Sequence, residues 1–308
     1  MKGKKTMIFV AGGTGFVGRR LLRGLKEEGR SIRCLVRNRE KAEWVAGLGF
    51  EAAEGDISDP GSLKGALESI DTVVHLVGII EEKGGATFES VHVKGTGHLV
   101  NEAVAAGVKH FFYQSALGAD PASPFGYLKT KAKAEEIVTS SGIDYTIFRP
   151  SLIVGEGDGF TERMKQIVSL GPVVPVPGDG TARFQPFSVD DWYRAFQKVL
   201  DGKVERNRTY EMGGAEQLTY NEILREILLV LHLDKLIVHL PMGLTRLMLP
   251  FMGPARSVAS LLGKEIPEVT ADLLALLSRD NICAIDSLEK DFGIEPIPFA
   301  EALRSFLK

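Results

Sequence analysis

The chain has 308 residues, 44% of them apolar, which is enough for one large domain or two modest ones around a buried core. Its 37 basic and 40 acidic residues are mixed along the chain and give a net charge of -3, which argues against a basic face for nucleic acid. The two cysteines, Cys34 and Cys283, stand far apart in apolar runs, and we expect reduced, buried thiols rather than a disulfide or a metal site. The basic start precedes an apolar stretch only as long as a strand, so we expect no signal peptide and a cytoplasmic location.

The first half of the chain alternates apolar runs with segments of helical periodicity. The apolar runs predict strands at residues 7–11, 32–36, 50–55, 72–78, 110–116 and 145–150. They are rich in Val, Ile and Phe and lack polar alternation, which is typical of a parallel sheet covered on both faces. We therefore predict an α/β fold with a doubly wound Rossmann domain over residues 1–150. Residues 151–308 are predicted to form a smaller mixed α/β substrate-binding part, with some segments returning to the Rossmann sheet.

A glycine-rich stretch follows the first predicted strand. Gly12, Gly15 and Gly18 stand three residues apart, and a helix is predicted to start near Phe16. A tight turn, a close approach of the backbone to pyrophosphate and close packing of helix on sheet each require a missing Cβ. The free N–H groups of the helix N-terminus would then face the phosphates. The predicted dinucleotide-binding residues of this stretch are Gly12, Gly13, Thr14, Gly15, Phe16, Val17, Gly18 and Arg19.

A second group of residues has the chemistry of proton transfer. Tyr127 and Lys131 are four residues apart in a predicted helix over 126–141, so their side chains share one face. Ser115 ends the fifth predicted strand, at the carboxyl edge where open α/β sheets bind ligands. A tyrosine with an ordinary pKa of about 10 needs its phenolate stabilised to act near neutrality, and an ammonium group supplies this. We predict Ser115, Tyr127 and Lys131 as catalytic residues; the alternative is a solvated helix face.

The order of the motifs resembles the extended and atypical short-chain dehydrogenase/reductase superfamily. The motifs are GGTGFVG, the GD pair at 55–56, VVHLVG, Ser115, Y-x-x-x-K, FRPS at 148–151 and GEGDG. Within the superfamily, stretches such as QSALGAD and RFQPFSVDD are most similar to bacterial relatives of the reductase-like accessory subunit of respiratory complex I. The resemblance covers nearly the whole chain and implies a Rossmann fold and hydride transfer with a nicotinamide cofactor.

The resemblance also implies roles for individual residues. Tyr127 would be the general acid/base, Lys131 would bind the nicotinamide ribose and lower the pKa of the tyrosine, and Ser115 would hold the substrate oxygen. The remaining implied cofactor contacts are Asp56 and Ile57 at the adenine, Val77 and Gly78 after the fourth strand, and Phe148, Pro150 and Ser151 beside the nicotinamide. One departure concerns His92, which stands where many extended members have an asparagine. We expect it to be a packed helix histidine.

The residues after the second predicted strand bear on the choice of cofactor. An NAD site usually ends that strand with an acidic residue that bonds the ribose hydroxyls. This chain reads CLVRNREK, with Arg37 directly after the strand. A guanidinium can hold a 2′-phosphate through two hydrogen bonds, and Arg19 would close the other side. We therefore predict NADP (NADPH), with NAD as the alternative, and expect Arg39 to be a surface charge.

The segment 236–255 is apolar over about the length of a membrane span but contains three prolines and an arginine. Five of its residues share one face of a predicted helix: Leu244, Leu247, Met248, Phe251 and Met252. We expect a core-facing helix, with a lid over a lipophilic substrate as one alternative and peripheral contact with the inner face of the membrane as another.

These observations predict NADPH-dependent hydride transfer to a hydrophobic carbonyl or quinone-like small molecule, without a metal. A first alternative is a non-catalytic nucleotide-binding accessory protein of a respiratory or quinone-biosynthesis assembly. A second is a nucleotide-sugar epimerase or dehydratase, against which the apolar segment 236–255 argues. The sequence leaves the substrate and the oligomeric state open.

Overall fold

A computed structural model describes residues 6–245, 247, 270, 274 and 276–307. The chain forms two compact units. The first consists of the residues up to Pro150 together with Tyr193–Met212, and the second of Ser151–Trp192 together with the residues from Gly213 onward.

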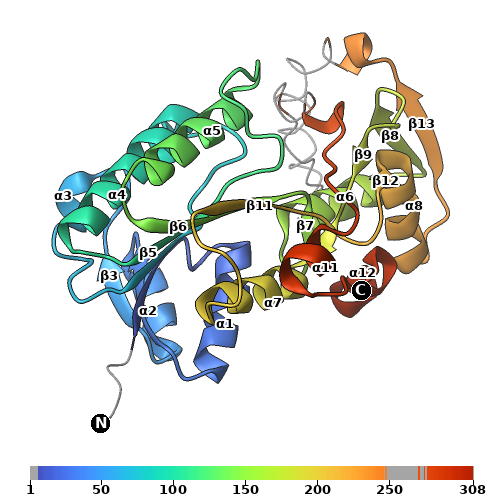
Figure 1. Cartoon of the computed structure of the whole chain (residues 1–308). Coiled ribbons are helices and arrows are strands. Elements are labelled where there is room, and N and C mark those ends of the chain that lie inside the picture. The colour runs from blue at the N-terminus through green and yellow to red at the C-terminus, as the bar shows by residue number, and fades with distance from the viewer. Residues whose placement is uncertain (1–5, 246, 248–269, 271–273, 275, 308) are drawn as a thin grey trace. The chain divides into compact units, whose positions relative to one another are not determined.

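The first unit is built on a seven-stranded parallel sheet in the order β11-β6-β5-β4-β1-β2-β3 (Figure 1). Its strands are β1 (Met7–Ala11), β2 (Ser31–Val36), β3 (Glu51–Glu54), β4 (Thr72–His75), β5 (His110–Gln114), β6 (Asp144–Pro150) and β11 (Arg208–Met212). The chain runs outward from β1 to β3 and then returns to place β4 beside β1. The strand order therefore reverses between β1 and β4, and ligands of such sheets bind at the carboxyl edge of this reversal.

Helices cover both faces of this sheet. They are α1 (Phe16–Glu27), α2 (Arg39–Gly47), α3 (Pro60–Leu63), the π-helical segment η1 (Glu89–Lys94), α4 (Gly95–Ala105), α5 (Gly126–Thr139) and the second half of α7 (Val189–Leu200). In Figure 1, α3, α4 and α5 lie on one face, and α1 lies on the other. Buried side chains of the strands, among them Phe9, Val73 and Phe111, pack with Leu99 and Val138 of the covering helices. Burial on both faces is the reason that the strands read as continuous apolar runs.

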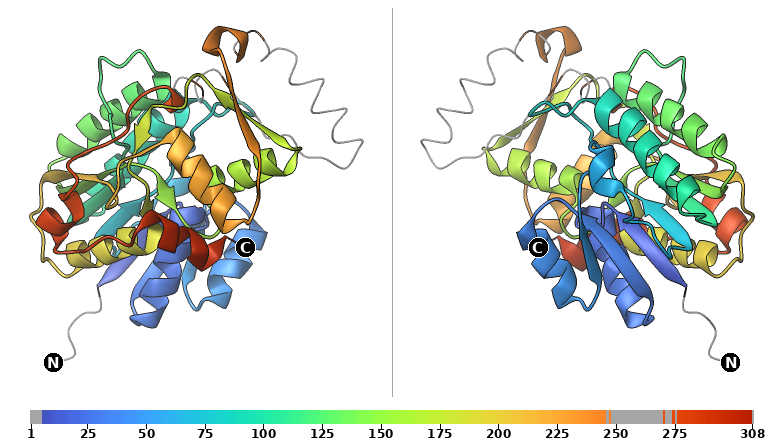
Figure 2. Two further views of the ribbon diagram at one scale, coloured as in Figure 1. Left: turned by 90° about the vertical axis from the view of Figure 1, so that its right-hand side faces the viewer. Right: turned by 90° about the vertical axis from the view of Figure 1, so that its left-hand side faces the viewer.

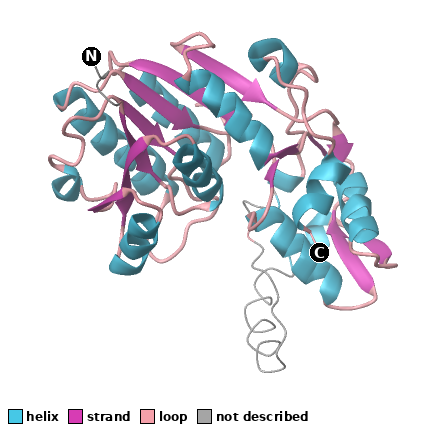
Figure 3. Ribbon diagram, turned by 90° about the horizontal axis from the view of Figure 1, so that it is seen from below, coloured by secondary structure: helices cyan, strands magenta, loops and turns pink. Residues whose placement is uncertain are grey.

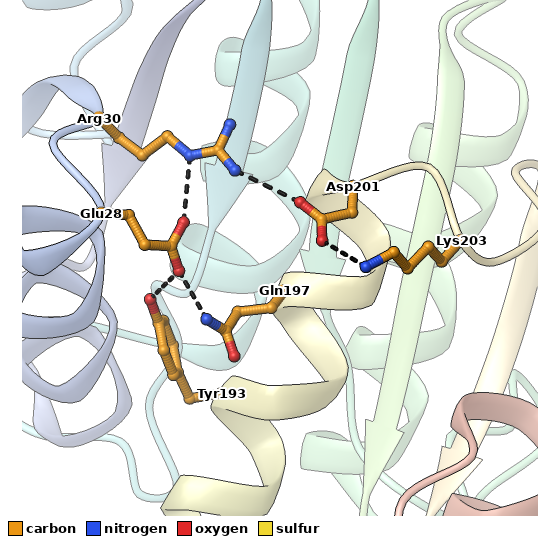
Figure 4. A network of polar contacts seen from close by, with 6 residues as sticks. All are labelled: Glu28, Arg30, Tyr193, Gln197, Asp201 and Lys203. Carbon is orange, nitrogen blue, oxygen red and sulfur yellow. Dashed lines mark hydrogen bonds and ion pairs between the residues drawn. The ribbon is translucent and has the colours of Figure 1, made fainter.

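A polar network joins α1 to α7 within the first unit (Figure 4). The Tyr193 hydroxyl and the Gln197 amide each donate to Oε1 of Glu28 at 2.6 Å. Arg30 donates to the other carboxylate oxygen of Glu28 at 3.1 Å. A Cβ on Gly24 would collide with the ring of Tyr193, so a glycine is required for this close packing of the two helices.

The second unit contains short strands and helices (Figure 3). Its strands are β7 (Ile153–Val154), β8 (Val173–Pro177), β9 (Arg183–Phe184), β10 (Phe187–Ser188), β12 (Leu218–Thr219) and β13 (Leu236–Leu240). Its helices are α6 (Gly159–Ser169), the first residues of α7, α8 (Tyr220–Val230), α11 (Ser287–Phe292) and α12 (Phe299–Phe306). The strands pair in twos, as β10-β7, β12-β9 and β13-β8. Residues of α6, α8 and α12 form a separate core that includes Val168, Ile227 and Leu303.

The structure confirms the predicted fold class, a doubly wound parallel sheet flanked by helices (Figures 1 and 2). The fourth strand is shorter than predicted and ends at His75; beyond it, the N–H of Ile79 donates to Nε2 of His92 instead of to a neighbouring strand. Cys34 is buried as expected, whereas Cys283 is only half-buried, and neither forms a disulfide.

The predicted apolar helix is only partly covered by the described residues. Met248, Phe251 and Met252 lie outside them. Leu244 and Leu247 are 46% and 68% exposed, which differs from the core-facing position expected for that face. No helix among residues 6–245, 247, 270, 274 and 276–307 is long and apolar enough to cross a membrane.

Candidate functional site

The turn between β1 and α1 depends on two glycines. Gly12 has φ +91°, and a Cβ on it would lie 2.9 Å from the backbone of Leu76 and Val77 at the exit of β4. A Cβ on Gly18 would collide with the Gly12 carbonyl, so this glycine brings α1 close to the turn. Gly15 is the N-cap of α1, and the first N–H groups of the helix have no intrahelical acceptor. This end of α1 is suited to an anionic group.

The turn opens into a cavity of about 550 Å³ at the carboxyl edge of β1, β2 and β4. Eight of the predicted cofactor residues line it: Gly12, Thr14, Gly15, Arg37, Asp56, Ile57, Val77 and Gly78. Further lining residues, not identified from the sequence, are Leu35, Val36, Lys41, Gly55, Ser58, Leu76, Ile79, Gly84, Gly85, Ala86, Ser90 and Val91. The volume lies within the range of small-molecule and cofactor pockets. A glycine-rich turn, a helix N-terminus and a cavity of this size fit a dinucleotide.

Two cations line the cavity after β2. Arg37 is exposed, and Lys41 follows it by four residues, in the first turn of α2. Arg39 forms an exposed ion pair with Glu43 at 2.9 Å, as expected of a surface charge. Arg19, predicted to close the phosphate site, does not line the cavity; its Nε donates to the Thr14 carbonyl at 3.0 Å and its guanidinium lies over the ring of Trp44. Lys41 is the second cation, besides Arg37, among the residues that line the cavity.

The loop after β3, which lines the cavity with Asp56 and Ile57, is held by hydrogen bonds to both residues. Oδ1 of Asp56 accepts from both the backbone N–H and the hydroxyl of Ser58, at 2.9 and 2.8 Å. The Ile57 carbonyl is bonded to Nδ1 of His98 at 2.8 Å, and the Ile57 side chain is buried beneath Gly95 of α4. Both residues therefore hold the loop after β3 in one conformation.

Ser115 directly follows β5 and is 3% exposed. Its backbone N–H donates to the Phe148 carbonyl at 2.8 Å, whereas its hydroxyl has no hydrogen-bond partner among the described residues. A buried hydroxyl without a partner is costly, and such groups often mark the place of a ligand.

Lys131 is buried in α5, and its ammonium group reaches the cavity wall. Nζ donates to the carbonyl of Gln114 at 2.9 Å, next to Ser115, and lies 5.1 Å from the centre of the Tyr113 ring. A Cβ on Gly78 would lie only 3.0 Å from Nζ, so this glycine leaves room for the lysine beside the cavity. Burial lowers the pKa of Lys131 to about 8, against the opposing effect of Glu135.

Tyr127 lies in the first turn of α5, one turn before Lys131. Its ring meets those of Phe88 and His92 edge-on, at 5.9 and 5.6 Å between centroids. Burial raises the pKa of Tyr127 to about 12. This direction is opposite to the lowering expected from Lys131, because burial dominates at the phenol of the ligand-free protein. Tyr127 is a protonated acid at neutral pH.

Phe148 and Pro150 support the site through their backbones. The Phe148 ring is buried against Phe112 at 4.7 Å, and its carbonyl accepts from Ser115. The Pro150 carbonyl accepts from the Leu117 N–H at 3.0 Å. These two strand-end residues thus fix the loop after β5.

Several predicted cofactor residues do not line the cavity: Gly13, Phe16, Val17, Gly18, Arg19, Tyr127, Lys131, Phe148, Pro150 and Ser151. Ser151 belongs to the second unit, where its hydroxyl bonds to Asn281 at 2.7 Å and accepts from the Gln185 N–H at 3.1 Å. No group of three potential metal ligands occurs in the part of the chain that the structure describes.

The parallel sheet, the glycine turn at its strand reversal and the cavity beside them define a dinucleotide-binding protein of the Rossmann class. The model of the NAD(P)H-binding family matches residues 12–169, about half of the chain, and the chain belongs to this family. Its relatives and structural neighbours are of the extended short-chain dehydrogenase/reductase and epimerase type, as the motifs predicted.

Two relatives are similar to this chain in sequence, and one solved structure is similar to it in fold. Subunit 9 of the NADH dehydrogenase [ubiquinone] 1 alpha subcomplex from Arabidopsis thaliana is 30% identical over 226 residues, which are 70% of this chain and 55% of that protein. Ceramide reductase from Caulobacter vibrioides is 30% identical over 185 residues, 60% of this chain and 58% of that protein. The matches thus span little more than half the length of these relatives. An NADPH-dependent quinone oxidoreductase from Escherichia coli has the same fold, with a TM-score of 0.72 at 22% identity over 97% of this chain and 99% of that one.

Proposed function

We propose that this protein is an NADPH-dependent reductase of a hydrophobic carbonyl or quinone-like small molecule. The observation that carries the proposal is the buried ammonium of Lys131, held beside the cavity wall at Gly78 by the carbonyl of Gln114. The next residue, Ser115, has a buried hydroxyl without a hydrogen-bond partner among the described residues. Burying a charge costs free energy unless the charge is paired or hydrogen-bonded, and strongly perturbed buried groups are concentrated at functional sites.

Each of the three predicted catalytic side chains has a separate role in this proposal. The Ser115 hydroxyl would donate to the carbonyl oxygen of the substrate and stabilise the negative charge that develops there. The bound nicotinamide would supply the hydride. The Tyr127 hydroxyl would then give its proton to the oxygen, and the positive charge of Lys131 would stabilise the phenolate left behind.

The proposed reduction requires Tyr127 to carry its proton. Burial raises the pKa of Tyr127 to about 12, so the phenol is protonated at neutral pH and can donate to the substrate oxygen. With a pKa of about 8, Lys131 is still mostly charged at pH 7.

The cations after β2 support NADPH as the cofactor. Arg37 and Lys41 both line the cavity after β2, where NAD sites have an acidic residue. We expect them to hold the 2′-phosphate, the guanidinium through two hydrogen bonds and the ammonium as a point charge.

The substrate class rests on the relatives. Two of the similar proteins are a ceramide reductase and an NADPH-dependent quinone oxidoreductase, and we infer from these names a largely apolar carbonyl or quinone as the substrate. The test is a screen of NADPH oxidation by the purified chain against long-chain ketones, sterol ketones and quinones of increasing tail length. We expect turnover that rises with tail length; if none of these compounds is reduced, the proposal is contradicted.

A second candidate is a nucleotide-binding accessory protein of a respiratory assembly. It is favoured by the similarity to the NADH dehydrogenase subunit. Tight NADPH binding without turnover, together with recovery of the chain in a membrane-protein complex after mild solubilisation, would favour this candidate over the reductase.

A further inference from the structure

His92 lies in the π-helical segment η1, a rare conformation that is often found at functional sites. Its side chain is completely buried. On one side the ring of Phe88 is stacked on it at 5.6 Å between centroids, and on another the ring of Tyr127 meets it edge-on at 5.6 Å. The imidazole of His92 is therefore packed against the ring of Tyr127, the residue proposed to donate the proton.

Both ring nitrogens of His92 are hydrogen-bonded, and the partners fix which nitrogen carries the proton. The backbone N–H of Ile79 can only donate, so Nε2, at 3.1 Å, is the acceptor. Nδ1 then carries the proton and donates to the Thr130 hydroxyl at 3.0 Å. That hydroxyl in turn donates to the Gly126 carbonyl at 2.7 Å. A single neutral tautomer satisfies the whole chain of bonds.

The two partners of the imidazole belong to different parts of the site. Ile79 lines the cavity together with Gly78, and a Cβ on Gly78 would lie 3.5 Å from Nε2 of His92. Thr130 lies in the turn of α5 that carries Tyr127, and its hydroxyl is also 3.1 Å from the Tyr127 carbonyl. One side chain thus joins the cofactor-facing loop to the turn that carries the acid.

We propose that His92 is a positioning residue, a neutral clamp that fixes the loop at Ile79 relative to Tyr127. The role in turnover rests on the proposed reductase function; the role in cofactor binding does not. An imidazolium would present an N–H to the Ile79 N–H and break the clamp. Burial, and after it the charges of Lys131 and His75, lower the pKa of His92 to about 3, which keeps the ring neutral.

Two substitutions of His92 each remove one of its two hydrogen bonds and keep the other. The amide of asparagine reaches the position of Nδ1, so His92→Asn keeps the donor to Thr130 and loses the acceptor for Ile79. The amide of glutamine reaches the position of Nε2, so His92→Gln keeps the acceptor and loses the donor. His110→Asn is the matched control, because His110 is a buried histidine whose Nε2 bonds the Thr146 hydroxyl at 3.0 Å and which does not line the cavity.

The dissociation constant of NADPH and kcat with the best compound of the substrate screen are measured for each variant. We expect His92→Asn to raise the dissociation constant about tenfold, equivalent to about 1.4 kcal/mol, and His92→Gln to lower kcat about tenfold with an unchanged dissociation constant. His110→Asn should lower the melting temperature without affecting either quantity. Nitrogen NMR of the imidazole in the ligand-free protein should show the Nδ1–H tautomer and no titration down to about pH 5.

The clamp would be overturned by equal effects of the two His92 variants on both quantities, by the same loss of NADPH affinity in His110→Asn, or by an Nε2–H tautomer. If no compound is turned over, the reductase function fails, while the binding and NMR measurements still decide whether His92 is a clamp. Unchanged NADPH affinity in His92→Asn would refute the clamp even in an active enzyme.

Discussion

Arg37 offers the sharpest test of the cofactor assignment, because a single substitution should reverse a preference. Arg37 and Lys41 face the cavity after β2, and Arg37 is exposed to solvent. A charge-assisted hydrogen bond contributes about 1.5–3 kcal/mol when shielded, and an exposed ion pair about 0.2–1 kcal/mol. The exposed Arg37 and the half-buried Lys41 on one phosphate should therefore together give about 1.4 kcal/mol, a tenfold preference for NADPH over NADH.

The assay is the quenching or enhancement of nicotinamide fluorescence on titration with NADPH and NADH. Arg37→Ala should reduce the preference to a few-fold, and Arg37→Asp should reverse it, because a carboxylate bonds the ribose hydroxyls and repels the 2′-phosphate. Arg39→Ala is the matched control: that arginine is two residues away, paired with Glu43 and outside the cavity wall. We expect it to leave both affinities unchanged.

Salt gives an independent check on the same claim. At an ionic strength of about 1 M the screening length falls to about 3 Å, so the preference of the wild type for NADPH should shrink. The reversed preference of Arg37→Asp should shrink as well, because the repulsion between its carboxylate and the 2′-phosphate is also screened. Equal affinities of the wild type for NADPH and NADH at low salt would refute the assignment, as would a loss of preference in Arg39→Ala as large as in Arg37→Ala.

Three further predictions concern the site and its support. The proposed reduction needs Lys131 in its charged form, and the pKa of Lys131 is about 8. We therefore expect kcat/KM to be constant below pH 8 and to fall above it; a profile that is flat to about pH 10 would contradict this role. Gly18→Ala should abolish NADPH binding, because the added Cβ would collide with the Gly12 carbonyl. Calorimetric titration of the folded variant tests this, and an affinity equal to that of the wild type would contradict it. Tyr193→Phe should reduce the free energy of unfolding in urea by about 1 kcal/mol, because it removes the donor to Glu28, while an unchanged value would mean that Gln197 and Arg30 satisfy the carboxylate alone.

The sheet and the nucleotide turn could be predicted because local rules dictate them. Buried parallel strands require continuous apolar runs, and the glycines at 12 and 18 have no space for a Cβ in the structure. The predicted first strand matches β1, and the helix begins at Phe16 as expected.

The hydrogen bonds of the site could not be predicted, because they depend on contacts between residues far apart in the chain. The sequence places Arg19 after Gly18 but does not show that Trp44 of α2 and the Thr14 carbonyl engage it. Likewise, the pattern Y-x-x-x-K puts Tyr127 and Lys131 on one helix face but does not show how deeply each is buried. Burial sets the direction of both pKa shifts.

Lys41 and the loop at Gly84–Ala86 are lining residues that the sequence analysis missed. Lys41 carries a usable signal, its spacing of four residues from Arg37 at the start of a helix. The sequence of the loop gives little signal beyond its pair of glycines, which is typical of any tight hairpin. In the structure, the backbones of Lys83 and Ala86 are hydrogen-bonded to each other across the loop at 3.1 and 3.0 Å.

The central claim is that Tyr127 donates the proton in an NADPH-dependent reduction. The most direct measurement is kcat of Tyr127→Phe, with the dissociation constant of NADPH determined on the same preparation. The ring and its contacts with Phe88 and His92 remain in this variant, and only the hydroxyl is lost. The account predicts a fall in kcat of about 10²-fold or more with NADPH affinity unchanged within a few-fold. Full turnover by Tyr127→Phe would contradict it.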